Sequence, residues 1–317
     1  MSTFSTQGPD LASLDGYREL KERVGFIERF ELGRLLLRGV DRRTYLHGIL
    51  TNDIQSLAAG SGCYAALLTP QGRMITDMHV YELGDATLIT LPLSLAPAVR
   101  DRLDQYIFAE DVQVEDASAA TVQYGVYGPL AQDSIGQLTS QPLLGVVPSD
   151  EIGLPGFEVV ALRSQAPEIE RLLTEAGARP VGRGVIEVFR VEAGMPQFLV
   201  DMNTDTIPLE ASIEDRAISM SKGCYPGQEV IIRVLHRGGG RVAKKLVGMV
   251  FPAGGVVPPV GEKVKSGERE IGSITSAVMS PRLARPIALG YVHRDFVAPG
   301  TRVRVGEAEA EVSALPF

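Results

Sequence analysis

One octapeptide combines a cation, a thiol, a phenol, an amide and a carboxylate: Lys222-Gly223-Cys224-Tyr225-Pro226-Gly227-Gln228-Glu229. Two glycines and a proline around the thiol favour an irregular backbone that can hold Cys224 at the rim of a pocket. A lysine two residues away favours the thiolate, which is the reactive form of cysteine. The alternative interpretation is a Gly/Pro-rich turn before a strand, in which Cys224 is an inert apolar side chain.

Two carboxylates outside this octapeptide are candidates for ligand binding. Asp77 lies in an otherwise apolar run, and period-two alternation places it on one strand face with His79 and Tyr81. Glu158 follows Phe157 at the start of a predicted strand. In a concave site such a carboxylate can accept two N–H bonds from a flat heterocyclic ring, whereas on a solvated face it needs no function. The sequence alone leaves both interpretations open.

Two further charged segments have simpler explanations. Arg190 and Glu192 bracket Val191, which is typical of a salt-bridged helix end at the surface. The basic stretch 236–241 is compatible with an anion site or with a solvated linker. The chain contains no P-loop, no G-x-G-x-x-G after a strand and no G-x-S-x-G motif, so nucleotide hydrolysis and acyl transfer have no motif to support them.

Composition restricts the class of protein. A length of 317 residues exceeds a usual single core and predicts two or three domains. The net charge of −8 argues against strong direct nucleic-acid binding through a broad basic face. The polar first ten residues lack a secretory apolar region, and no apolar run is long enough to span a bilayer, so we expect a cytoplasmic protein without a membrane partner.

The cysteines and histidines predict neither disulfides nor a metal site. The two cysteines, Cys63 and Cys224, lie far apart in the sequence, and the four histidines are scattered. Cys63 lies in an apolar, strand-like run, and we expect it in the core.

The hydrophobic pattern predicts two strand–helix–strand units followed by an all-β segment. The first helix follows Asp10, the second follows Asp41, and a hairpin is expected to join strands at 63–68 and 74–83. Further helices are predicted at 96–107, 168–176 and 185–193, and further strands at 86–91, 112–115, 122–127 and 157–162. We therefore expect two ferredoxin-like α+β subdomains, residues 1–110 and 111–240, and a small β-barrel or sandwich at 241–317.

The octapeptide resembles the K-G-C-Y-x-G-Q-E signature of the YgfZ-type folate-binding proteins, the family that includes a mitochondrial iron–sulfur assembly factor. All seven defined positions are present. The segment Ile207-Pro208-Leu209-Glu210-Ala211 is similar to the P-x-E-A segment that precedes the signature, and His236-Arg237-Gly238 is similar to the H-R-G that follows it.

The whole chain also resembles the T-protein (aminomethyltransferase) superfamily. The matching segments are Leu50-Thr51-Asn52-Asp53, the hairpin to Asp77, Gly156-Phe157-Glu158, Arg190-Val191-Glu192-Ala193-Gly194 and Gly272-Ser273-Ile274-Thr275-Ser276. This resemblance implies an α+β fold of three domains arranged as a cloverleaf, with a C-terminal β-barrel, around a central pocket for tetrahydrofolate or a folate derivative.

Two departures favour the YgfZ branch over the aminomethyltransferases. Thr76 replaces the first member of their acidic pair, although Asp77 matches the second. Ile186 stands where they carry an arginine, and an apolar side chain cannot replace the charge-assisted bonds of a guanidinium.

The resemblance implies an accessory folate-binding factor that assists assembly or repair of iron–sulfur clusters in client enzymes and thereby supports tRNA modification. Iron–sulfur client enzymes or cluster carriers would then be its partners. Cys224 is expected to be the functional thiol, with Lys222 and Tyr225 beside it, and the expected folate contacts are Asp77, Glu158, Arg190, Gln228 and Glu229. The alternatives are a folate-dependent aminomethyltransferase or other C1-transfer enzyme, and a scaffold that binds no folate.

Overall fold

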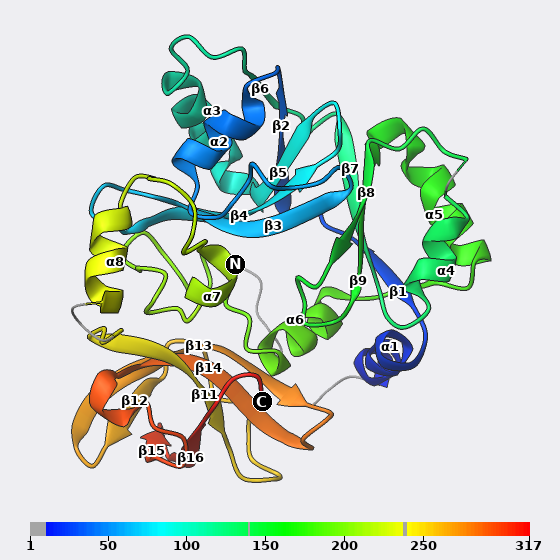
Figure 1. Cartoon of the computed structure of the whole chain (residues 1–317). Helices are drawn as coiled ribbons and strands as arrows, with labels where there is room; N and C mark the ends of the chain where they lie inside the picture. Colours follow the sequence, from blue (N-terminus) through cyan, green and yellow to red (C-terminus); the bar gives the residue numbers. More distant parts are fainter. Residues whose placement is uncertain (1–10, 139, 237–239) are drawn as a thin grey trace.

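The computed structural model describes residues 11–138, 140–236 and 240–317. Its first sheet is antiparallel with strand order β3-β4-β5-β2-β6, and helices α2 and α3 pack against one face (Figure 1). Leu35, Leu46, Ile49 and Val99 are among the side chains buried between this sheet and its helices. The elements are β2 (Leu32–Arg38), α2 (Arg42–Ile49), β3 (Ser61–Leu68), β4 (Met74–Glu82), β5 (Thr87–Pro92), α3 (Ala96–Gln105) and β6 (Gln113–Asp116).

The second sheet has strand order β10-β1-β7-β9-β8. Helices α4 and α5 bury Ile135, Ile169 and Leu173 against one of its faces. The elements are α1 (Leu11–Glu22), β1 (Gly25–Glu28), β7 (Thr121–Tyr127), α4 (Ala131–Gly136), β8 (Gly145–Ser149), β9 (Gly156–Leu162), α5 (Ala166–Glu175), β10 (Arg179–Pro180) and α6 (Arg183–Glu192).

Two strands, β1 and β6, each belong to the sheet that their position in the chain does not suggest. Strand β1 precedes β2 in the chain but lies in the second sheet, whereas β6 follows α3 and pairs with β2 in the first. The sheets also share a core in which Tyr81 and Leu88 from the first sheet pack with Val147 and Val160 from the second. The two α+β units are therefore packed directly on one another.

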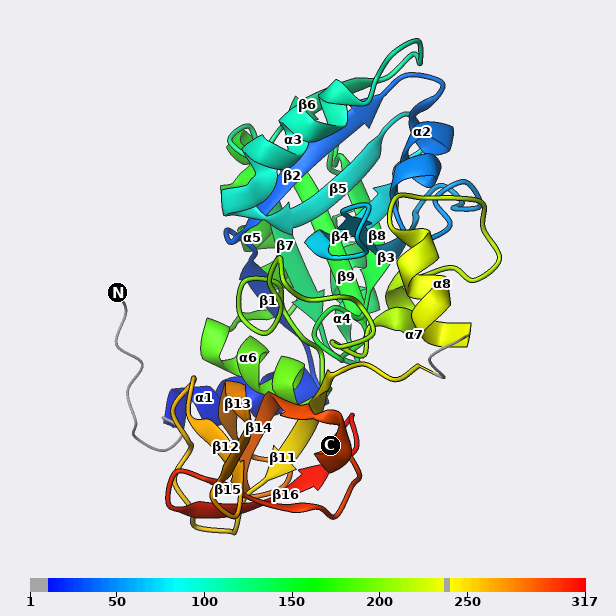
Figure 2. The same cartoon turned by 90° about the vertical axis from the view of Figure 1, so that its left-hand side faces the viewer.

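The C-terminal segment forms a closed barrel with strand order β11-β14-β13-β12-β15-β16, and β16 pairs back onto β11. Its strands are β11 (Lys244–Val250), β12 (Lys263–Ser266), β13 (Arg269–Ser280), β14 (Arg285–His293), β15 (Arg302–Val305) and β16 (Ala308–Ser313). Helices α1 and α6 lie between the barrel and the second sheet (Figure 2), and the rings of Tyr17 and Phe189 stack there at 4.5 Å. The predicted α+β cloverleaf with a C-terminal barrel is confirmed.

A long connection between α6 and β11 carries two short helices, α7 (Glu214–Ala217) and α8 (Gln228–His236). Single 3-10 turns lie at Leu93–Leu95, Arg163–Gln165 and Arg294–Phe296. The predicted capping residue Asp10 and the segment Arg237-Gly238 lie outside the described residues. Within the described part of the chain, no helix has the length and apolar character needed to cross a membrane.

Candidate functional site

A cavity of about 650 Å³ lies where β3 and β4 of the first sheet meet β8 and β9 of the second. The rings of Tyr64, His79, Tyr81 and Phe157 line it, and α7 adds the guanidinium of Arg216. This volume and this aromatic lining are typical of a small-molecule site.

Strand β4 also carries Asp77, which does not line the cavity itself but is hydrogen-bonded to Tyr64, which does. Burial alternates along the strand as predicted: Thr76 and Met78 face the core of the first sheet, while Asp77 lies on the other face with His79. The hydroxyl of Tyr64 donates a hydrogen bond of 2.8 Å to Asp77. Burial nevertheless raises the pKa of Asp77 to about 6, against the hydrogen bonds from Tyr64 and the Phe198 amide. Asp77 and His79 are both partly buried, so this strand face is not a fully solvated one.

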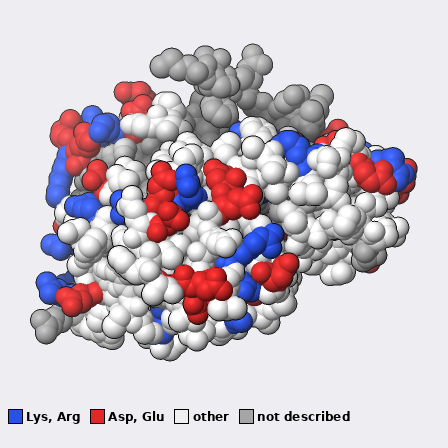
Figure 3. All heavy atoms as spheres, turned by 90° about the horizontal axis from the view of Figure 1, so that it is seen from above, with Lys and Arg blue, Asp and Glu red and all other residues white. Residues whose placement is uncertain are grey.

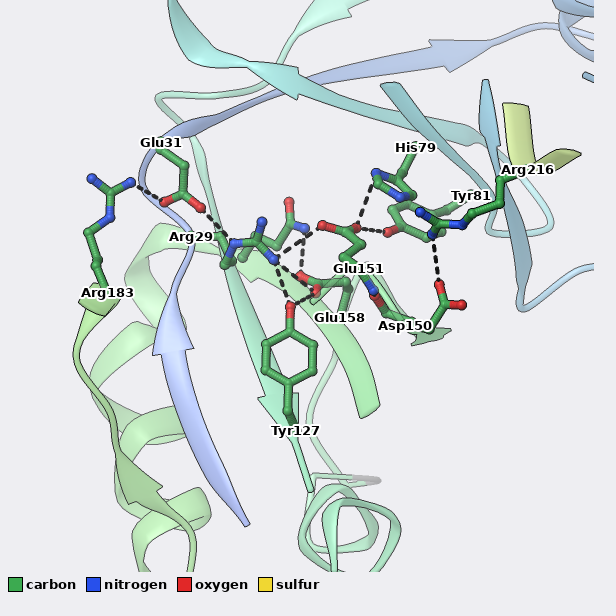
Figure 4. Close-up of polar contacts among 12 residues, drawn as sticks. Arg29, Glu31, His79, Tyr81, Tyr127, Asp150, Glu151, Glu158, Arg183 and Arg216 are labelled. Carbon is green, nitrogen blue, oxygen red and sulfur yellow. Dashed lines mark hydrogen bonds and ion pairs between the residues drawn. The ribbon is translucent and has the colours of Figure 1, made fainter. Parts of the chain in front are cut away.

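Next to the cavity, Arg29 lies at the centre of a buried ion-pair cluster (Figure 4). Its guanidinium lies 3.2 Å from Glu151 and 3.3 Å from Glu158, and it donates hydrogen bonds to Glu31 at 2.7 Å and to the Tyr127 hydroxyl at 2.6 Å. Three carboxylates around one buried cation form a site in which their pKa values depend on one another.

Glu158 is fully buried inside this cluster and is not among the residues that line the cavity. It accepts hydrogen bonds from Gln123 at 2.7 Å and from Tyr127. Burial, followed by the charge of Glu151, raises the pKa of Glu158. The structure thus gives Glu158 protein partners, and its contact with a folate stays a prediction.

Glu151, in the turn between β8 and β9, connects the cluster to the cavity. Burial alone raises its pKa, but the neighbouring His79 ring, the charge of Arg29 and the hydrogen bond from Tyr81 outweigh burial, so the pKa lies below its usual value. A carboxylate that is ionised and held from several sides can orient the ring of His79 beside it.

Cys224 is exposed and does not line the cavity. The ammonium of Lys222 donates hydrogen bonds to the carbonyls of His47 and Leu50, the latter at 2.5 Å, and lies 4.9 Å from the Tyr225 ring. Burial lowers the pKa of Lys222 to about 8, while the nearby acidic groups Asp53, Cys224 and Cys63 raise it. Tuning of the Cys224 thiol by Lys222 stays a prediction.

The octapeptide docks onto the β3–β4 hairpin through Gly227. Its φ is +84°, and a Cβ there would lie 2.5 Å from the Thr69 carbonyl and 3.0 Å from the Cα of Gly72. Only glycine allows this approach. Helix α8 begins immediately afterwards, so the alternative of a turn before a strand is wrong, and an exposed Cys224 is not an inert core residue.

The remaining octapeptide residues make few polar contacts. Tyr225 is buried, and its hydroxyl has no hydrogen-bond partner among the described residues. No side-chain hydrogen bond of Gln228 or Glu229 occurs within the part of the chain that the structure describes. Folate contacts of these two residues remain predictions.

Arg190 has a structural set of partners. It is 6% exposed and donates hydrogen bonds to Asp201 at 2.7 Å, Ser276 at 2.7 Å and Glu187 at 2.8 Å. The hydrogen bond to Ser276 connects α6 to β13 of the barrel. The expected surface ion pair is thus a buried one, and a folate contact of Arg190 stays a prediction.

Cys63 lies on β3, packs beside the first core and also lines the cavity. Burial raises the pKa of its thiol to about 12. The expectation of a core cysteine is therefore correct only in part. In the described residues no group of three or more His, Cys, Asp or Glu is placed to hold a metal ion.

A second cavity of about 790 Å³ lies between the barrel and the connection that follows α6. Arg73, Lys244, Tyr291 and His293 are among its lining residues. None of the predicted site residues lines it.

Sequence reasoning missed several residues of the site. Tyr64, Arg29, Glu151 and Arg216 come from separate segments, and nothing local in the sequence indicates that they meet. The positions of His79 and Tyr81 could be predicted from the sequence, because period-two alternation places their side chains on the same strand face as Asp77.

The residues around the cavity fit a reduced folate. Four rings can pack against a planar pterin, and the partly buried Asp77 carboxyl can accept N–H bonds. The guanidinium of Arg216 lies 5.3 Å from the centre of the Tyr64 ring, and its ion-pair partner among the described residues is Asp150, at 3.3 Å, whose side chain is 73% exposed. Such a weak surface pair leaves the guanidinium free to bind a ligand carboxylate.

Comparison with known proteins gives consistent similarities. The GCVT N-terminal domain family matches residues 5–144, and the glycine cleavage T-protein C-terminal barrel domain family matches residues 244–317. An aminomethyltransferase of Streptomyces avermitilis is 29% identical over 96% of this chain and 88% of its own length. One of Thermus thermophilus is also 29% identical, over 94% of this chain and 88% of its own length.

Among solved structures, the glycine cleavage system aminomethyltransferase T of Bartonella henselae superposes with a TM-score of 0.85. It is 20% identical and covers 96% of this chain and 89% of that one, so it shows a shared fold. Together these similarities support the prediction of tetrahydrofolate or a folate derivative as the cofactor.

Proposed function

Because the chain belongs to the glycine cleavage T-protein superfamily, we propose that it binds tetrahydrofolate between its two sheets and acts in folate-dependent one-carbon transfer. The observation that carries this proposal is the aromatic-lined cavity, one of whose rings, Tyr64, donates a hydrogen bond to the carboxyl of Asp77. The relatives named aminomethyltransferase support the same class of reaction.

When bound, tetrahydrofolate supplies the amine nitrogens that accept or release a one-carbon unit. Tyr64 holds the Asp77 carboxyl in place through its hydroxyl. Since the pKa of Asp77 lies near 6, this carboxyl can take up or release a proton close to neutral pH. The surrounding rings restrict water, which strengthens the hydrogen bonds of Asp77.

The test combines a binding and a reaction measurement. Anaerobic calorimetric titration should show saturable binding of tetrahydrofolate with about one ligand per chain. Formation of methylene-tetrahydrofolate from an aminomethyl donor should then be detectable. Absence of binding would reject the whole proposal, whereas binding without product would reject only the transferase activity.

The exposed Cys224 beside Lys222 supports a second candidate function. Here the folate-binding protein is an accessory factor that assists assembly or repair of iron–sulfur clusters in client enzymes of the cytoplasm. Ile186, in the position of the substrate-binding arginine of the aminomethyltransferases, favours this candidate.

Replacing Cys224 by serine separates the two functions. If the thiol carries the function, Cys224→Ser should abolish support of iron–sulfur enzymes in cells while fold and folate affinity stay unchanged. Ser221→Ala, at an exposed position directly before the octapeptide, is the matched control. Full complementation by Cys224→Ser would reject a role for the thiol.

A further inference from the structure

His79 combines a ring in the cavity with a nitrogen that has no partner. The ring lies next to Tyr64, with centroids 4.9 Å apart, and parallel to Tyr81 at 6.1 Å. Its Nδ1 is 3.4 Å from a Glu151 oxygen. Its Nε2 is buried and has no hydrogen-bond partner among the described residues. Buried polar atoms are nearly always paired, so Nε2 is a candidate to pair with a ligand.

The surroundings of His79 determine which kind of partner Nε2 can take. Glu151 is held by Arg29 at 3.2 Å and by the hydroxyl of Tyr81, and it presents an ionised oxygen to Nδ1. An ionised carboxylate can only accept, so the ring proton belongs on Nδ1. Nε2 then carries a lone pair.

The charges around the ring also keep it neutral. Burial lowers the pKa of His79, and the guanidinium groups of Arg216 and Arg29 lower it further, against the opposing charges of Glu151 and Asp150. A neutral imidazole with its proton on Nδ1 is a hydrogen-bond acceptor at Nε2.

We propose that Nε2 of His79 accepts a hydrogen bond from a ring N–H of the bound ligand, and that Glu151 positions the imidazole for this contact. The inference rests on the proposed folate site and adds a specificity rule to it. Tetrahydrofolate carries N–H groups on the reduced half of its pterin, at positions where fully oxidised folic acid has only lone pairs. An acceptor at this place therefore selects the reduced cofactor.

The experiment compares binding of tetrahydrofolate and folic acid by anaerobic calorimetry. The wild-type protein should prefer tetrahydrofolate about tenfold or more, since one buried acceptor is left unpaired by folic acid. His79→Phe keeps an aromatic ring but removes the acceptor, and it should lose most of this preference through weaker tetrahydrofolate binding. His79→Gln restores a distal acceptor oxygen and should retain part of the preference.

Controls separate this inference from the proposed function. His293→Phe, in the barrel at the second cavity, should leave both affinities unchanged. A full preference for tetrahydrofolate in His79→Phe would overturn the inference and leave the folate site standing. A wild-type protein that binds neither ligand would overturn both. If His79→Phe fails to fold, loss of the preference in a folded His79→Gln variant also overturns the inference.

Discussion

Replacing Asp77 by asparagine should stabilise the protein at neutral pH while weakening its proposed function. The folded state raises the pKa of Asp77 from 3.8 to about 6, and burial is the main cause. The folded state therefore binds the proton more tightly than the unfolded chain. Stability falls as pH rises from about 4 to about 6, and above this window the full cost of the buried charge remains.

The structure gives the size of this cost. A shift of about two pKa units corresponds to roughly 3 kcal/mol at about 1.4 kcal/mol per unit. Asparagine can still accept the hydrogen bonds from Tyr64 and from the Phe198 amide, but it carries no charge. The gain in the free energy of unfolding should thus be close to zero near pH 3.5 and approach about 3 kcal/mol at pH 8.

Urea unfolding followed by circular dichroism at several pH values measures this gain from the shift of the midpoint. Asp205→Asn is a suitable control because the Asp205 side chain is 83% exposed and lies 3.7 Å from Arg73. Its effect should stay within about 0.5 kcal/mol. A gain for Asp77→Asn that does not depend on pH, or a loss of stability at pH 8, would refute the reasoning. The same variant should bind tetrahydrofolate more weakly.

Two structural substitutions test how the site is held in place. Gly227→Ala should destabilise the protein by about 1–3 kcal/mol because its φ is positive and its Cβ would meet the Thr69 carbonyl. Gly223→Ala, which has open space around it, should cost much less in the same urea unfolding assay. Arg190→Ala should cost about 3–5 kcal/mol, since it leaves a buried carboxylate without its partner. Arg171 forms two ion pairs at the surface, so Arg171→Ala should lower the free energy of unfolding by at most about 1 kcal/mol. Equal losses for Arg190→Ala and Arg171→Ala would contradict the structural role of Arg190.

The hydrophobic periodicity of the sequence was sufficient to predict much of the fold and which side chains share one strand face of the site. The alternation in β4 correctly places Asp77 with His79 and Tyr81, because side chains in a strand point to opposite faces in turn. The short strands after residue 240 correctly predict a small all-β domain, and of the two alternatives left open, a barrel or a sandwich, the structure shows the barrel. Periodicity does not determine which sheet a strand joins, and for this reason the crossing of β1 and β6 was not foreseen.

The charged part of the site could not be predicted, because it depends on long-range pairing. Arg29 and Glu158 are 129 positions apart, and no local pattern shows that they meet. The same limit explains Arg190, whose partner Ser276 comes from the barrel. The octapeptide was recognised from local residue types alone, but its docking on the hairpin through Gly227 required the structure.

Surface charge gives no reason to favour a polyanionic partner. On the face shown in Figure 3, acidic and basic side chains are interspersed. The net charge of −8 agrees with this view. A small ligand in the cavity is therefore the better-supported partner.

Hydrogen–deuterium exchange with and without tetrahydrofolate tests the central claim, that a folate binds between the two sheets. Bound tetrahydrofolate should slow exchange in β3, β4 and the turn from β8 to β9, with little change around the second cavity at the barrel. Protection confined to the second cavity, or no protection at a saturating concentration of tetrahydrofolate, would show that no folate binds between the sheets.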